Sequence, residues 1–239
     1  TAYERRYTGP ALARDQLTFN SYMRAAVRNE LPPINVHSDE FSGLHTGYRM
    51  VYYKTSAMLF NLQYVLGDTL FNGALRHYFQ QWKFKHPYME DMRQSFTDYT
   101  KTDLNWFFDQ WIDTDKRIDY AVRGVKHRMK DAGQQILLRR KGGMQMPLDL
   151  RVVARDGSTH DFHIPNTWFT KKTDATVLPR WIGYDELQRD YIAAVNIPSG
   201  IEQVIIDPTD RLADAYKVND HLLPPVDVQF DHHVWNRPD

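Results

Sequence analysis

Three residues in the first quarter of the chain carry the clearest candidate chemistry: Tyr48, Tyr52 and Lys54. Tyr48 lies four residues before Tyr52, so the two phenols share one face if the segment is a helix. A phenol stays protonated at neutral pH and can donate a hydrogen bond to the oxyanion that develops during carbonyl hydrolysis. The same pattern also fits two core tyrosines bonded to neighbouring carbonyls, and the spacing alone favours that structural interpretation.

Lys54 follows in the same apolar segment. We expect its ammonium to be buried or half-buried beside a carboxylate partner, because an unpaired charge is costly inside a protein. A structural role is favoured over a catalytic one. If the segment borders a substrate cleft, Tyr48 and Lys54 are candidate residues of its lining.

Several other kinds of active site are missing from the sequence. It has no His-Glu-x-x-His zinc motif, no Gly-x-Ser-x-Gly elbow and no glycine-rich phosphate loop. It has no cysteine, which excludes disulfides, thiolate metal sites and a cysteine nucleophile. The adjacent His232 and His233 fit an exposed polar tail better than a metal site.

Composition narrows the class of protein further. The chain has 239 residues, with 30 Lys plus Arg against 30 Asp plus Glu, so no basic excess attracts nucleic acid. Its 42% hydrophobic content argues for a folded core rather than disorder. No apolar run is long enough to predict a transmembrane helix.

The elements that must position the candidate residues begin with helices. Apolar residues recur at helical spacing from about Gly9 to Asp113, which predicts about five helices. The second is apolar nearly all round and is therefore expected to be buried, with partners for its few polar side chains. It should end at Gly67, with Asp68 capping the third helix and Thr102 the fifth. The first two helices are expected near Pro10–Glu30 and Tyr48–Leu66, and the other three have apolar faces at Phe71–Trp82, Met89–Tyr99 and Leu104–Ile112.

The second part of the chain reads as strands. From about Ile118 to Ile206 apolar and polar residues alternate, with Gly142-Gly143 and Asp156-Gly157 as tight turns. This pattern is typical of an antiparallel sheet with one buried face. The expected strands are Ile118–Lys126, Gln135–Arg140, Met146–Ala154, Thr159–Ile164, Trp168–Lys171 and Gln203–Ile206.

A family resemblance gives these elements an interpretation. The stretch 47–54, Gly-Tyr-Arg-Met-Val-Tyr-Tyr-Lys, followed by Leu66-Gly67-Asp68, resembles the gluzincin aminopeptidases, the family of aminopeptidase N. Residues 78–87, which end in Lys-His-Pro, resemble the next helix and turn of that family. Residues 103–111 resemble the helix that precedes its β-domain. The resemblance covers residues 1–206 and is most specific over 48–120.

The resemblance implies a fold class and a domain organisation. It implies an α+β chain: residues 1–116 form the helical lobe of a thermolysin-like peptidase domain, with about five helices. Residues 117–210 form a small antiparallel β-sandwich-like domain. Residues 211–239 are expected to be a linker or tail that leads to a further domain.

The resemblance also implies a function. In such an enzyme Tyr52 matches the catalytic tyrosine that stabilises the oxyanion, and zinc is the cofactor of the complete protein. The opening residues 1–7 resemble the segment just after the third zinc ligand of the family. All zinc ligands and the general base are then expected upstream of Thr1, so this segment should hold no metal and be inactive alone. The expected partners are a peptide substrate and the upstream zinc-binding half of the same protein.

Two other interpretations remain open from the sequence. One is a degenerate, non-catalytic peptidase-like domain that binds peptides or serves as a scaffold, although retention of Tyr52 favours the enzyme. The other is a free-standing α+β interaction module whose motifs are accidental. The sequence does not fix the compartment; of the possible locations, the cell envelope or export is the one we favour.

Overall fold

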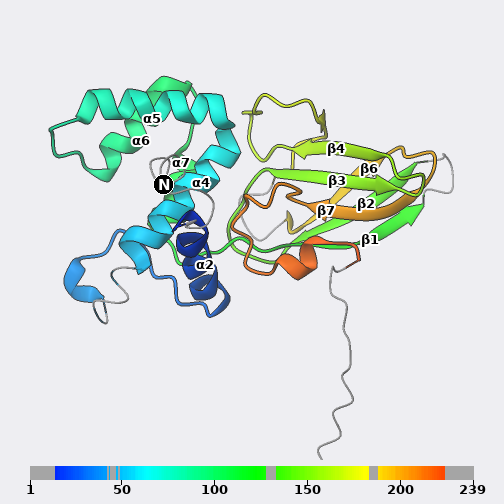
Figure 1. Ribbon diagram of the computed structural model, residues 1–239, viewed down its shortest axis with the longest axis horizontal. Helices are drawn as coiled ribbons and strands as arrows, with labels where there is room; N and C mark the ends of the chain where they lie inside the picture. The colour runs from blue at the N-terminus through cyan, green and yellow to red at the C-terminus, as the bar shows by residue number, and fades with distance from the viewer. Residues whose placement is uncertain are drawn as a thin grey trace, which may run out of the picture.

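The computed structural model describes residues 14–41, 43, 47, 49–127, 133–182 and 188–223. A helical part and a β part lie next to each other along the long axis of the molecule (Figure 1). The described helices of the first part end at Ile112 and the first strand begins at Tyr120. The predicted α+β fold class, a helical lobe followed by a small β-domain, is therefore confirmed. Among the described residues, no helix is long and apolar enough to cross a membrane.

The helical lobe is built around one buried helix. α4 (Thr55–Leu66) buries seven of its side chains, as expected for a helix that is apolar nearly all round. Its polar Asn61 has both partners that burial requires: Nδ2 donates to the Ala57 carbonyl at 2.8 Å, and Oδ1 accepts from the Ala213 amide at 3.1 Å. The other helical elements are α2 (Arg14–Val27), the short η2 (Ser38–Glu40), the π-helix η3 (Arg49–Lys54), α5 (Asp68–Trp82), α6 (Met89–Thr100) and α7 (Asn105–Ile112).

Helix boundaries follow the sequence only in part. Gly67 ends α4 as predicted, and its φ of 79° is a backbone conformation that favours glycine. Gly67 is also the N-cap of α5, so the cap expected from Asp68 is wrong. The cap expected from Thr102 is wrong as well, because α7 begins after Leu104. There the Asp103 carboxylate, rather than Thr102, accepts the Asn105 amide at 2.9 Å.

Aromatic side chains fill the space between these helices. Tyr22 of α2 lies 5.5 Å from Trp111 of α7 between ring centroids, and both rings are buried. Phe96 of α6 contacts both Phe71 of α5 and Phe108 of α7. These contacts join the first, third, fourth and fifth long helices into one core, against which α4 is packed.

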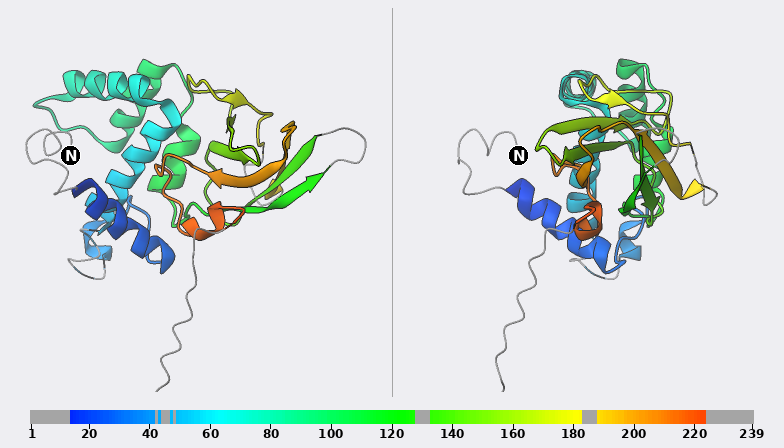
Figure 2. Two further views of the ribbon diagram at one scale, coloured as in Figure 1. Left: turned by 45° about the vertical axis from the view of Figure 1, so that its right-hand side comes forward. Right: turned by 90° about the vertical axis from the view of Figure 1, so that its right-hand side faces the viewer.

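The β part is a sandwich of two sheets. One sheet has the order β1-β2-β6 and is antiparallel; the other has the order β5-β4-β3-β7, in which only the β4–β5 pair is parallel. Side chains of both sheets alternate, so that Ile136 and Leu138 are buried together with Leu150 and Val152. Figure 2 shows the sandwich from two further directions. The strands are β1 (Tyr120–His127), β2 (Gln134–Arg140), β3 (Leu148–Ala154), β4 (Thr159–Ile164), β5 (Thr176–Val177), β6 (Asp190–Val195) and β7 (Ile201–Ile206).

Three features of the β part differ from the sequence expectation. Residues Trp168–Lys171 form no strand, and the edge strand of that sheet is the two-residue β5. β6 was not expected. A tail was expected from residue 211, yet residues 211–223 pack on the sandwich through the short helix η5 (Lys217–Asp220). The buried side chains of Asp214 and Asp220 hold this segment among the other residues of the domain.

The two parts are joined by a largely buried polar cluster, in which His163 and Tyr64 are buried and Asp149 and Lys171 are partly exposed. The Asp149 carboxylate on β3 lies 2.7 Å from Nδ1 of His163 and 2.6 Å from Nζ of Lys171. Lys171 also donates to the Tyr64 carbonyl of α4 at 3.0 Å, and the Tyr64 hydroxyl accepts the Asp149 amide at 2.8 Å. The cluster fixes α4 against the sheet with the order β5-β4-β3-β7.

Candidate active site around Tyr52

Tyr52 lies on the π-helix η3, which continues directly into α4. A π-turn accommodates one more residue than an α-turn and is frequently found at functional sites. Because α4 is buried on nearly all sides, the turn has a rigid support. Side chains on such a support are held in a narrower range of positions than side chains on loops.

The turn divides its side chains between solvent and core. Val51 and Tyr52 are 50% and 56% exposed, whereas Lys54 is completely buried. Tyr53, between them, is half-buried and packs against the core. The phenol of Tyr52 is therefore at the molecular surface, where another molecule can reach it. The apolar sequence pattern predicted one buried helix over Tyr48–Leu66 and did not distinguish this exposed turn from α4.

Lys54 connects the turn to two distant segments. Its Nζ donates to the carbonyl of Pro32, after α2, at 2.9 Å, and to the carbonyl of Thr114, after α7, at 2.8 Å. The predicted burial of Lys54 is confirmed, but the expected carboxylate partner is replaced by backbone carbonyls. Since the side chain faces inward, Lys54 does not line the exposed surface beside Tyr52. It holds the turn in place instead.

The environment of Lys54 also changes its acid–base behaviour. Burial lowers the pKa of its ammonium to about 8, and the opposing effect of the Asp115 charge does not cancel this. Both the ammonium and the neutral amine can donate to the two carbonyls, so these contacts survive deprotonation. No side-chain pattern in the sequence points to Pro32 or Thr114, because their backbone oxygens make the contacts.

An open hollow lies beside these carbonyls. Tyr52 is not among the described residues that line it, so the hollow and the phenol are separate surface features. Tyr48, the other predicted cleft residue, lies outside the described residues. The hollow is lined by the segments on either side of the Lys54 contacts: residues 29–33 and residues 113–116.

Metal ligands were not expected in this segment. Among the described residues, no group of three or more His, Cys, Asp or Glu side chains is arranged to hold a metal ion. His160 and His163 lie on opposite faces of β4, as their odd spacing requires: His163 contacts Asp149, and His160 contacts Ser158. His232 and His233 lie outside the described residues.

Comparisons with known proteins place this geometry in context. Residues 13–111 match the model of the peptidase family M1 domain. The fold is similar to a crystal structure of Legionella pneumophila aminopeptidase A in complex with aspartic acid, with a TM-score of 0.52 and 14% sequence identity. The match covers 82% of this chain but 24% of that one, so the chain spans a small share of that protein's length. No curated protein sequence matches the chain.

Proposed function

Because residues 13–111 of this chain match the model of the peptidase family M1 domain, we propose that the chain is the helical lobe and β-domain of a zinc aminopeptidase. In this proposal the complete protein removes N-terminal residues from peptides, and Tyr52 stabilises the oxyanion of the reaction. The structural neighbour is itself an aminopeptidase in complex with an amino acid, which supports the assignment to this class of enzyme.

One observation carries the role of Tyr52: its phenol is exposed at the surface although its helix leads into the core. Had this tyrosine only a packing role, burial of its ring would be expected, as for Tyr22 and Tyr64. Tyr52 instead extends from a π-turn that Lys54 ties to Pro32 and Thr114. A hydrogen-bond donor on a rigid support is what oxyanion stabilisation requires, because little reorganisation is then needed during the reaction.

The chemistry assigned to this chain is limited to that donor. The phenol would keep its proton and donate a hydrogen bond to the oxygen that becomes negative when the scissile carbonyl is attacked. One such donor typically contributes about 10²–10³ in rate. The described residues offer no zinc site, so in this proposal the zinc would be held by residues of the complete protein outside them.

The proposal is tested on the complete protein and on this segment in parallel. Zinc content and hydrolysis of an aminoacyl anilide are measured for both. We expect bound zinc and turnover in the complete protein, and neither in the segment alone. A complete protein that binds peptides but neither binds zinc nor hydrolyses the anilide would favour the non-catalytic, scaffold interpretation.

A further inference from the structure

The turn between α5 and α6 lies at one end of the molecule, away from the sandwich (Figures 1 and 2). Around this turn, Phe79 and Tyr88 are 61% and 79% exposed, and Phe84 is completely exposed. Phe79 belongs to the last turn of α5, Phe84 lies in the connection, and Tyr88 is the N-cap of α6. We call residues 79–88 the hairpin tip. Exposed apolar side chains that gather in one place are typical of a surface that binds another molecule.

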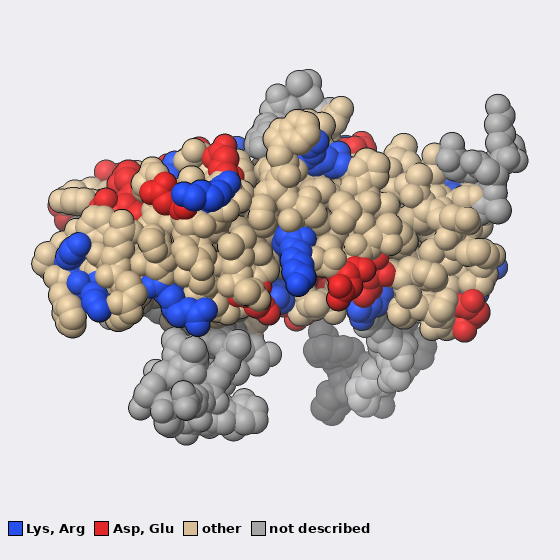
Figure 3. All heavy atoms as spheres, turned by 90° about the horizontal axis from the view of Figure 1, so that it is seen from above, with Lys and Arg blue, Asp and Glu red and all other residues tan. Residues whose placement is uncertain are grey.

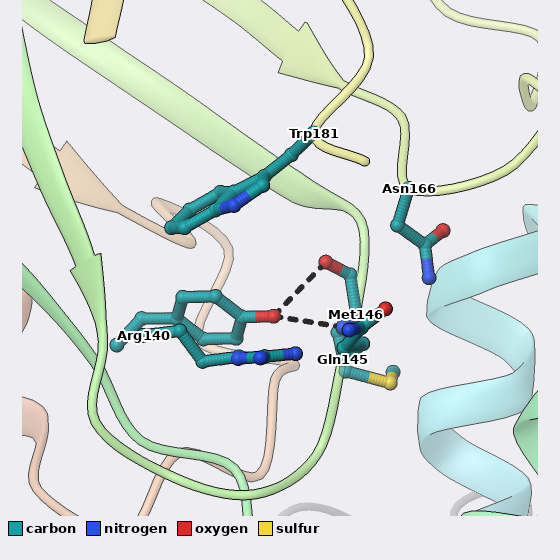
Figure 4. A pocket seen from close by; sticks show the side chains of 6 residues that line it. Arg140, Gln145, Met146, Asn166 and Trp181 are labelled. Atoms are coloured by element: carbon teal, nitrogen blue, oxygen red, sulfur yellow. Dashed lines mark hydrogen bonds between the residues drawn. The ribbon is translucent and has the colours of Figure 1, made fainter. Parts of the chain in front are cut away.

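These three rings differ from the aromatic side chains of the core. In the β part, Tyr120 and Trp181 form an edge-to-face pair with ring centroids 5.6 Å apart, and the Tyr120 hydroxyl bonds to the backbone of Met146 (dashed in Figure 4). Within the part of the chain that the structure describes, none of the three exposed rings of the hairpin tip pairs with another aromatic ring. Packing inside the described chain therefore does not account for them.

The backbone of the turn makes Phe84 still more unusual. Lys83 has φ −53° and ψ 132°, Phe84 has φ 64°, and the Lys85 amide donates to the Trp82 carbonyl at 2.9 Å. These values are those of a type II β-turn, whose third residue is normally glycine because a side chain is strained at positive φ. A phenylalanine in full contact with water gains nothing from packing at this position. An interaction with another molecule explains the ring better.

The charge of the segment indicates the kind of partner. No Asp or Glu occurs between residues 69 and 89, whereas Arg76, Lys83 and Lys85 do. Lys83 donates to the side-chain oxygen of Gln80 at 2.7 Å, and Lys85 lies over the ring of Trp82, so both ammonium groups keep their full positive charge. At this end of the molecule, Figure 3 shows basic side chains (blue) and acidic ones (red) on opposite sides. The hairpin tip therefore combines exposed rings with a positive charge.

We propose that the hairpin tip binds the surface of an anionic lipid membrane. Aromatic rings can enter the boundary between lipid headgroups and acyl chains, while the flanking lysines stay beside the acidic headgroups. A protruding turn can enter a deformable lipid surface, whereas a protein partner would need a cavity shaped to receive it. This contact uses neither Tyr52 nor Lys54, so it is separate from the proposed enzymatic function and is tested without an activity assay.

Co-sedimentation with lipid vesicles tests the proposal. The complete protein is mixed with vesicles of phosphatidylcholine, or with vesicles in which part of this lipid is replaced by the anionic phosphatidylglycerol. Binding to the anionic vesicles should be about tenfold tighter and should weaken as salt is added. Phe84→Gly removes the ring and suits the turn, so it should weaken this binding about tenfold while the unfolding midpoint stays the same or rises. Lys85→Gln should weaken it about fivefold.

Two variants in the β part are the matched controls. Trp168→Gly removes another exposed aromatic side chain, and Lys172→Gln removes another exposed ammonium; both should bind the vesicles as the unmodified protein does. Absence of binding to anionic vesicles, as expected if another part of the complete protein covers the hairpin tip, would overturn the proposal. Equal binding by Phe84→Gly would do the same. A dimer in lipid-free solution that Phe84→Gly dissociates would show that the hairpin tip binds a second copy of the chain instead.

Discussion

The ammonium of Lys54 lies 2.8 Å from the carbonyl oxygen of Thr114, although 60 residues separate them in the chain. Through this contact the turn that carries Tyr52 is fixed to the segment between the last helix and the first strand. The geometry therefore links the turn of Tyr52 to the connection between the two parts of the molecule. The neighbouring Asp115 acts on Lys54 through its charge, whereas the contact with the Thr114 carbonyl is a direct hydrogen bond.

Replacement of Lys54 by methionine tests this support. The methionine side chain has a similar length but leaves the carbonyls of Pro32 and Thr114 without their donor. We expect a loss of about 1–3 kcal/mol in the free energy of unfolding. Lys172→Met, which removes an exposed ammonium, serves as the control and should change the stability by less than about 0.5 kcal/mol. Equal stability of the two variants in urea titrations would show that Lys54 does not hold the turn.

Asp149 should stabilise the contact between the two parts in a pH-dependent way. Burial raises the pKa of its carboxyl, but the hydrogen bond from His163 and the charge of Lys171 outweigh burial and lower the pKa below its usual range. A lowered pKa means that the stabilisation is present above the unfolded value of about 3.9 and is lost as the pH falls through the folded value. Asp149→Asn should therefore cost about 3 kcal/mol at neutral pH.

The measurement for Asp149 is urea unfolding across an acidic pH series. The difference between the unmodified protein and Asp149→Asn should shrink as the pH falls below about 3.9, because the carboxyl then becomes neutral in both states. The exposed Asp174→Asn is the matched control and should show no such trend. A difference that stays constant with pH would contradict the charge-based account.

Asp220 should have the opposite effect on stability. Its carboxylate is buried on η5 with neither oxygen hydrogen-bonded, and burial together with the charge of Asp214 raises its pKa far above the usual range. A raised pKa means that the folded state binds more protons, so stability falls as the pH rises above about 3.9. Asp220→Asn should thus raise the unfolding midpoint at pH 8 by about 3 °C or more. It should also reduce the slope of stability against pH; an unchanged or lower midpoint would show that the carboxylate is compensated.

Much of the fold was predictable because it depends on local patterns. The all-round apolar pattern of α4, the glycine stop at Gly67 and the alternation in β3 each follow from neighbouring residues. The two misplaced caps and the false strand at Trp168–Lys171 show the limit of the same rules. There, a plausible local motif was overridden by the packing of the surrounding chain.

The sequence predicted which residue forms the candidate site, but it did not predict how that residue is positioned. The position of Tyr52 came from a family motif, yet its exposure depends on a π-turn that no local pattern marks. The partners of Lys54 are backbone carbonyls from segments 22 and 60 residues away, which carry no side-chain signal. The cluster of Asp149, His163 and Lys171 likewise forms only when the strands and the connection after β4 come together.

The role of the exposed phenol is tested most directly by steady-state kinetics of Tyr52→Phe in the complete protein. Tyr53→Phe is the matched control, because it removes a hydroxyl from the adjacent, half-buried side chain of the same turn. We predict that Tyr52→Phe lowers kcat by about 10²–10³ with little change in KM, while Tyr53→Phe stays close to the unmodified enzyme. A Tyr52→Phe enzyme with nearly normal kcat would contradict the assignment.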